Sequence, residues 1–259
     1  MVKLAVILAA GSGVRINNRS DEKPKGFLEI DNETLIERSI DFLLKHKIEK
    51  IIIGTGYLSH FYERLKEKYP NVMTQKNDFY DKTSSFYTLH NMKDIINEDF
   101  LLLESDLIYE ERAITHLQRS KKKDIILASG RTNSQDEVFI ESDTNMMLVN
   151  MSKKKDDLKK IDGELVGVSK ISFQTFQNVC ALYTEDDIIT RKTDYEIVLT
   201  KSSQIYPITI ERIDDLVWTE IDNQHHLHRA INLILPKLKN KECVPSTPCS
   251  SDLEHFLRD

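Results

Sequence analysis

A glycine-containing loop near the N-terminus, followed by spaced cations, has the residue types that bind a polyphosphate. A short apolar segment leads into Gly11, Ser12 and Gly13, and Arg15 and Lys25 follow along the chain. Glycine lacks the Cβ atom that would hold a phosphate away from backbone N–H groups. Arginine and lysine supply the positive charge that consecutive phosphates need. The spacing therefore predicts a polyphosphate-binding site at this loop.

Two common phosphate-binding loops fit the same segment poorly. A dinucleotide-binding loop needs a third glycine three residues after the second, where this chain has Ile16. A Walker A loop needs Gly-Lys followed by Ser or Thr, which the segment lacks. An ordinary turn between a strand and a helix, with no ligand, remains the alternative interpretation of the two glycines.

Carboxylates follow two of the expected strands, at the edge where open α/β sheets bind their ligands. Glu104 and Asp106 come at the end of one buried strand, and Glu220 and Asp222 follow a late strand. Alternation along an extended segment places Glu220 and Asp222 on one side and Ile221 toward the core. Mg²⁺ prefers a few carboxylates together with substrate phosphate oxygens, which the two aspartates can provide. Either aspartate alone could instead cap a helix or lie on the surface.

The chain resembles the nucleotidyltransferases that activate sugars and small alcohols as nucleotide diphospho-derivatives. Their signature loop is matched by Leu8-Ala9-Ala10-Gly11-Ser12-Gly13-Val14-Arg15 and by Lys23-Pro24-Lys25. Within that superfamily the chain is most similar to the small cytidylyltransferases that act on phosphocholine and on 2-aminoethylphosphonate. The similarity covers residues 1 to about 240, nearly the whole chain.

This resemblance implies a Mg²⁺-dependent transfer of CMP from CTP, with release of pyrophosphate. The matched positions imply catalytic roles for Arg15, Lys25, Asp106 and Asp222, with Asp106, Asp222 and Glu220 at the metal. Relatives often have Asp-x-Asp in the first carboxylate motif, and Glu104 replaces its first member here. The residues implied in nucleotide binding are Leu8, Ala10, Gly11, Ser12, Gly13, Arg15, Lys25, Thr83, Ser84, Ser85, Thr88, Glu104 and Ser105. The hydroxyls between positions 83 and 88 could equally be simple helix caps.

The acceptor side favours a primary amine over a quaternary one. Phosphocholine-specific relatives have tryptophan in two acceptor-side segments, where this chain has Val138 and Glu196. A trimethylammonium group binds best in an aromatic cage, whereas a primary ammonium donates three hydrogen bonds that carboxylates accept. We therefore predict that Asp136, Tyr195 and Glu196 bind 2-aminoethylphosphonate, with phosphocholine and phosphoethanolamine as alternative acceptors. Asp136 and Glu196 could instead be surface acids in loops.

The elements that must position these residues alternate along the first half of the chain. Strands are expected at 3–8, 51–54, 72–74, 100–104 and 125–128, and helical periodicity covers 33–48 and 58–69. Such alternation is typical of right-handed βαβ units. The sequence therefore predicts an α/β fold: a Rossmann-like, mostly parallel mixed sheet with helices on both faces, in a single nucleotidyltransferase domain.

The second half of the chain predicts shorter elements. We expect a hairpin of strands 138–140 and 146–149 laid over the sheet, later strands at 165–168, 206–210 and 216–218, and helices near 173–182, 194–201 and 223–238. The lysine runs 121–123 and 153–155, and His225, His226 and His228, are expected to be solvated. The domain is predicted to end at 240, and 241–259 is a Pro/Ser-rich tail or a linker to a further fused domain.

The composition excludes several classes of protein. Of the 259 residues, 40% are hydrophobic and 30% charged, which suffices for one core. No apolar stretch approaches the roughly 20 residues that span a bilayer, and we expect no signal peptide before the first strand. Three cysteines without metal or disulfide spacing favour a cytoplasmic location. The net charge of −6 argues against a nucleic-acid partner.

Two further functions remain as alternatives to cytidylyl transfer. A sugar-1-phosphate nucleotidyltransferase would usually be longer, with insertions or a repeat domain. A non-catalytic nucleotide-sensing module in a fused protein would not need the full set of charged residues. That reading is disfavoured because Arg15, Lys25, Asp106 and Asp222 are all present.

Overall fold

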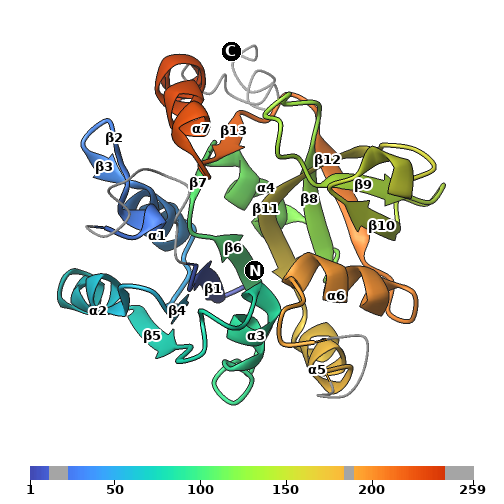
Figure 1. Ribbon diagram of the computed structural model, residues 1–259, viewed down its shortest axis with the longest axis horizontal. Helices are drawn as coiled ribbons and strands as arrows, with labels where there is room; N and C mark the ends of the chain where they lie inside the picture. The colour runs from blue at the N-terminus through green and yellow to red at the C-terminus, as the bar shows by residue number, and fades with distance from the viewer. Residues whose placement is uncertain (12–22, 184–189, 243–259) are drawn as a thin grey trace, which may run out of the picture.

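The computed structural model describes residues 1–11, 23–183 and 190–242, and Figure 1 shows how their elements are arranged. The main sheet consists of β1 (Leu4–Ala9), β4 (Lys50–Thr55), β5 (Val72–Lys76), β6 (Phe100–Glu104), β8 (Ile125–Ser129), β9 (Phe139–Ser142), β10 (Leu148–Ser152), β11 (Gly163–Ile171) and β12 (Thr209–Ile213). Two small ladders pair β2 (Glu29–Ile30) with β3 (Glu33–Thr34), and β7 (Leu107–Tyr109) with β13 (Trp218–Glu220). The α-helices are α1 (Leu35–Lys45), α2 (Ser59–Lys68), α3 (Ser85–His90), α4 (Arg112–Arg119), α5 (Phe173–Ala181), α6 (Tyr195–Ser203), α7 (Gln224–Arg229) and α8 (Leu235–Glu242).

The nine-stranded sheet is mixed, as the sequence predicts. Its order is β10-β9-β11-β6-β1-β4-β5, and β8 and β12 branch from β11. β1 pairs in parallel with β4 and β6, and the pairs β4–β5 and β8–β12 are also parallel. β11 runs antiparallel to β6, β8 and β9. The strand ends at β1 and β6 therefore point the same way and open on one edge of the sheet.

Helices cover both faces, which confirms the predicted layering. Alternate residues of β1 divide between the two cores: Ala5 and Ile7 face one side, and Leu4 and Val6 face the other. Buried residues of α1, α2 and α4 pack in the first core, and those of α3, α5 and α6 pack in the second. None of the described helices has the length and apolar character needed to cross a membrane.

The predicted hairpin forms, but it does not lie over the sheet. β9 and β10 pair antiparallel and extend the sheet at its edge. The reason is the length of β11: Val168–Ile171 pair with β6, while Gly163 and Glu164 extend beyond it and pair with β9. Pairing there satisfies backbone N–H and C=O groups that a hairpin on the face would leave open.

The closing helix is continuous but not uniform. α7, a π-helical turn at Ala230–Ile234 and α8 follow one another from Gln224 to Glu242. Ala230, Ile234 and Leu238 pack against Ile221, which places this helix beside the β7–β13 ladder. The helix thus extends past the expected end at 238, and the Pro/Ser-rich residues 243–259 lie outside the described residues.

Some element boundaries differ from the expectation for local reasons. Helix α1 begins at Leu35 instead of Glu33 because Glu33 and Thr34 pair with β2. The Thr34 hydroxyl accepts the Glu37 N–H at 3.2 Å and so caps the helix. The late strands are displaced by a few residues toward the C-terminus: β12 is Thr209–Ile213 and β13 is Trp218–Glu220.

Candidate active site

A cavity of about 450 Å³ opens at the carboxyl ends of β1 and β6. It gathers every predicted site residue that the structure describes, from elements far apart in the sequence. These lining residues are Leu8, Ala10, Gly11, Lys25, Thr83, Ser84, Ser85, Thr88, Glu104, Ser105, Asp106, Asp136, Tyr195, Glu196, Glu220 and Asp222. Ser12, Gly13 and Arg15 lie outside the described residues.

Lys25 bridges the two predicted metal aspartates. Its ammonium donates to Asp106 Oδ2 at 2.9 Å and also to Asp222 Oδ1. Burial lowers the pKa of Lys25, but the charges and hydrogen bonds of both aspartates outweigh it and raise that pKa above its usual value. Lys25 therefore stays charged, and it brings together carboxylates from the turn after β6 and from the segment after β13. The Asp222 side chain is only 3% exposed, deeper than a cleft surface.

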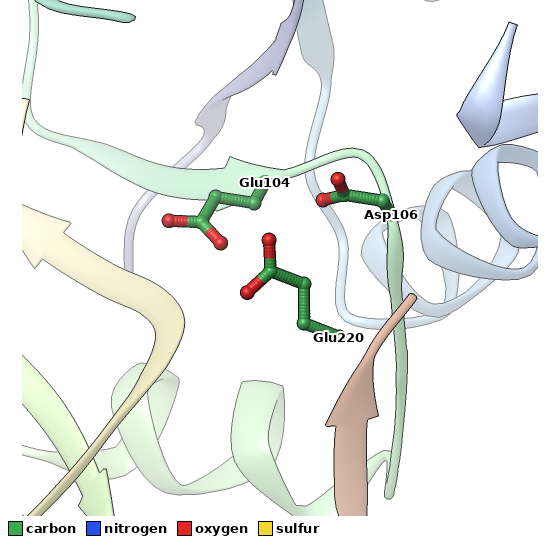
Figure 2. A group of neighbouring side chains, drawn as sticks. All are labelled: Glu104, Asp106 and Glu220. Atoms are coloured by element: carbon green, nitrogen blue, oxygen red, sulfur yellow. The ribbon is translucent and has the colours of Figure 1, made fainter. Parts of the chain in front are cut away.

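Three carboxylates form a cluster beside this bridge. Ligand oxygens of Glu104, Asp106 and Glu220 lie within 4.8 Å of one another, and Figure 2 shows the three groups turned toward a common space. Burial, and next the charge of Asp106, raise the pKa values of Glu104 and Glu220. Crowded carboxylates of this kind are stabilised by a cation, and carboxylate oxygens are the ligands that Mg²⁺ prefers.

The cluster includes Glu104, which the sequence did not assign to a metal. Glu104 is held from two sides: the Tyr195 hydroxyl donates to its Oε1 at 2.7 Å, and Gly167 lies against its Oε2. Gly167 has φ +78°, and a Cβ at this position would lie 2.6 Å from Oε2. Only glycine combines this backbone conformation with so close an approach.

The hydroxyl segment before and within α3 is held by side chains elsewhere in the fold. The buried Asn77 amide donates to Thr83 Oγ1 at 2.9 Å and to Thr88 Oγ1 at 3.0 Å. The hydroxyls of Ser84 and Ser85 both donate to Asp194, next to the start of α6. Ser84 precedes α3 without capping it through its side chain, so the simple capping interpretation is wrong for this serine.

The predicted acceptor residues line the cavity from two places: Asp136 lies in the loop before β9, and Tyr195 and Glu196 begin α6. Asp136 pairs with Lys153, whose Nζ lies 2.8 Å from Asp136 Oδ1. Burial, with the charge of Asp194, raises the pKa of Glu196 to about 7. Among the described residues, no cation forms an ion pair with the Glu196 carboxylate. Tyr195 is buried and committed to Glu104.

Two residues expected to be solvated line the cavity, and one of them, His226, is buried. His226 is 3% exposed, and its Nδ1 accepts the Asp222 N–H at 3.3 Å. Lys153 also lines the cavity, but its side chain is 54% exposed, and Lys154 and Lys155 of the same run are exposed as well. His226 follows Asp222 by one helical turn, a spacing that could have indicated this contact. No local pattern distinguishes Lys153 from its neighbours.

Comparisons with known proteins relate this chain to nucleotidyltransferases. The family model described as the MobA-like NTP transferase domain matches residues 5–161. The chain is 25% identical over 235 residues to CTP:phosphoglutamine cytidylyltransferase of Campylobacter jejuni, covering 84% of this chain and 92% of that protein. It is 27% identical over 111 residues to 2-aminoethylphosphonate cytidylyltransferase of Lancefieldella rimae, covering 42% of this chain and 45% of that protein.

Among solved structures, the chain resembles the CTP:phosphocholine cytidylyltransferase of Streptococcus pneumoniae. The TM-score is 0.71 at 22% sequence identity, over 88% of this chain and 97% of that one. At this identity the likeness shows a shared fold. It confirms the mixed α/β architecture predicted from the alternation of strands and helices.

Proposed function

The chain belongs to the MobA-like NTP transferase family, and from this membership we propose that it transfers CMP from CTP to 2-aminoethylphosphonate. The observation that carries the proposal is the bridge from Lys25 to Asp106 and Asp222 at the carboxyl edge of the sheet. A charged lysine beside paired carboxylates suits a reaction in which phosphoryl charge is gathered and neutralised. Relatives that use CTP, among them the phosphoglutamine enzyme, support the choice of nucleotide.

The proposed reaction is an in-line displacement at the α-phosphorus of CTP. A phosphonate oxygen of the acceptor attacks, the bond from the α-phosphorus to the bridging oxygen breaks, and pyrophosphate leaves with that electron pair. By analogy with phosphate monoesters, the acceptor's second pKa is roughly 6–7, so its attacking oxygen is largely ionised at neutral pH. The reaction therefore needs no general base, and catalysis consists of positioning and charge neutralisation.

Asp106, Asp222 and Glu220 would hold Mg²⁺. Asp106 and Glu220 belong with Glu104 to the carboxylate cluster, whose oxygens are of the kind that this ion prefers. When bound, the ion would neutralise charge on the phosphates of the nucleotide. Lys25 is placed to donate to the α-phosphoryl oxygens once its aspartates have another cation to pair with. Gly11 would leave the backbone N–H groups after β1 accessible to the phosphates.

The acceptor assignment rests on a carboxylate and on how few exposed aromatic rings the described lining offers; its aromatic residues are Tyr62, Tyr80, Tyr195 and Trp218. Trp218 is buried, and its Nε1 donates to Ser129 Oγ at 2.8 Å. Tyr195 is also buried and bonded to Glu104. Tyr62 is buried too, so Tyr80 is the one partly exposed ring of these four, and a single ring does not enclose a trimethylammonium group. The Glu196 carboxylate instead suits a primary ammonium, which donates hydrogen bonds.

A competition between acceptors tests this assignment. Wild-type protein with CTP and Mg²⁺ is given 2-aminoethylphosphonate, phosphoethanolamine or phosphocholine, and pyrophosphate release is measured. We expect the primary amines to be preferred over phosphocholine, and Glu196→Gln to reduce that preference by about tenfold. Equal or better turnover of phosphocholine by the wild type would refute the acceptor. Tight CTP binding with no turnover of any acceptor would favour the nucleotide-sensing alternative.

A further inference from the structure

Arg229 joins the strand that carries a proposed metal ligand to the loop on the acceptor side of the cavity. Its guanidinium donates to Thr219 Oγ1 at 2.7 Å and to Thr132 O at 2.8 Å. Thr219 lies on β13, directly before Glu220, and Thr132 belongs to the segment 131–138, which we call the acceptor loop. Arg229 itself comes from α7, which lies beside β13 (Figure 1), and it is not one of the described lining residues. It therefore ties two walls of the cavity together without lining it.

The acceptor loop is fixed near both of its ends. Near its start, the Thr132 N–H donates to Glu164 Oε2 at 2.8 Å while the Thr132 C=O accepts from Arg229. At the other end, the Leu165 N–H donates to Val138 O at 2.9 Å. Glu164 and Leu165 are neighbours on β11, so these two contacts hold the loop to the main sheet. The contact with Arg229 is the one of the three that relates the loop to β13.

The backbone between these ends needs such support. Asn133 and Gln135 have φ values of 55° and 76°, a left-handed conformation that costs free energy for a residue with a side chain. Conformations of this kind persist where the surrounding structure holds them. Asp136 follows directly and pairs with Lys153 at 2.8 Å. If Thr132 were released, the strained residues could relax, and Asp136 would move with them.

The guanidinium is suited to this place by its shape and its charge. Its planar fork presents two nitrogens side by side, so one side chain can bond to two separate partners. Burial lowers the pKa of Arg229, and the charges of Glu137 and Glu164 partly offset that effect. An arginine keeps its proton in such surroundings. Lysine has the same charge but donates from a single nitrogen, and methionine has a similar stem with no donor.

We propose that Arg229 is a positioning residue that sets the acceptor loop relative to the carboxylates after β13, and thereby determines how tightly the acceptor binds. It acts through Thr132 and Thr219 and not by contact with a substrate. The acceptor loop lines the cavity with Asp136 and Val138, so its position affects the acceptor side. Small displacements of groups that position a substrate have large effects on turnover. The inference rests on the proposed transfer to a small amine-bearing acceptor.

Kinetics of wild type, Arg229→Met and Arg229→Lys test this role, with pyrophosphate release measured over ranges of CTP and of 2-aminoethylphosphonate. In Arg229→Met the KM for the acceptor should rise about tenfold, the effect of one lost hydrogen bond, while the KM for CTP stays within twofold. Arg229→Lys can restore one of the two bonds and should lie between. Arg119→Met changes an exposed arginine on α4, and this matched control should keep the wild-type values.

Hydrogen–deuterium exchange of the same proteins, without substrates, tests the anchoring itself. Backbone amides in peptides covering 131–138 should exchange faster in Arg229→Met than in wild type or Arg119→Met. Unchanged exchange in these peptides, or an acceptor KM within twofold of wild type, would overturn the inference. A fall in kcat and melting temperature with both KM values unchanged would show that Arg229 only stabilises the fold.

The two measurements also separate this inference from the proposed function. If the wild type does not turn over 2-aminoethylphosphonate with CTP, the proposed function fails, whereas the exchange of 131–138 still decides whether Arg229 anchors the loop. Should Arg229→Met fail to fold, Arg229→Lys decides by the same two measurements, because it retains the charge beside Glu137 and Glu164.

Discussion

Replacing Glu196 by glutamine should stabilise the protein, and more strongly at pH 8 than at pH 5. Burial and the charge of Asp194 raise the pKa of Glu196 from 4.5 to about 7. The unfolded chain releases this proton near the ordinary value, while the folded chain retains it up to about pH 7. Between these values the folded state binds more protons, so its stability falls as the pH rises. Above pH 7 the folded protein bears the full free-energy cost of holding an ionised Glu196 in its buried site.

The size of the effect follows from the pKa difference. At about 1.4 kcal/mol per pH unit, the rise from 4.5 to about 7 corresponds to about 3 kcal/mol. Glutamine has nearly the same shape and cannot ionise, so Glu196→Gln removes this cost. In a domain of this size, 1 kcal/mol shifts the melting temperature by roughly 2–4 °C. The variant should therefore melt about 5 °C or more above the wild type at pH 8, and close to it at pH 5.

Thermal melting of both proteins at pH 5, 6, 7 and 8, without substrates, measures this dependence. Glu67→Gln, which changes an exposed carboxylate on α2, is the matched control and should show no such trend. A difference in melting temperature that stays the same from pH 5 to pH 8 would show that Glu196 is not held in a proton-retaining environment.

Three substitutions test the cavity and the support of Glu104 behind it. Asp106→Asn and Asp222→Asn should each lower turnover by about a hundredfold or more, because a charged ligand is lost where phosphoryl charge develops. Melting curves should show that both variants still fold, and wild-type pyrophosphate release by either would assign that aspartate a structural role. Gly167→Ala should destabilise the fold by about 1–3 kcal/mol in urea titration, because its φ is +78° and its Cβ would contact Glu104. An unchanged midpoint would argue against that strain.

The parts of the fold that follow from local pattern could be predicted from the sequence. Strand ends are visible where an apolar run stops, so Glu104 and Asp106 could be placed at a ligand-binding edge. The alternation at Glu220 and Asp222 was also sufficient to predict that both side chains face the site, since both line the cavity while Ile221 is buried. These predictions depend only on short periodicities and on the geometry of parallel strands.

The remaining features depend on contacts between distant segments. The Ser84–Asp194 and Tyr195–Glu104 hydrogen bonds join residues more than ninety positions apart, and no local pattern encodes them. The place of the β9–β10 hairpin likewise depends on how far β11 extends beyond β6. The contact of His226 with Asp222 differs, because it spans only four residues and their spacing could have indicated it.

The most direct test of the account is pyrophosphate release from each of the four common ribonucleoside triphosphates with 2-aminoethylphosphonate, in the presence of Mg²⁺ and again with excess EDTA. We expect turnover with CTP and Mg²⁺, at least tenfold less with UTP, ATP and GTP, and none with EDTA. Equal turnover with UTP or a purine nucleotide would contradict the cytidylyl assignment. Full turnover in EDTA would contradict the metal role of Asp106, Asp222 and Glu220.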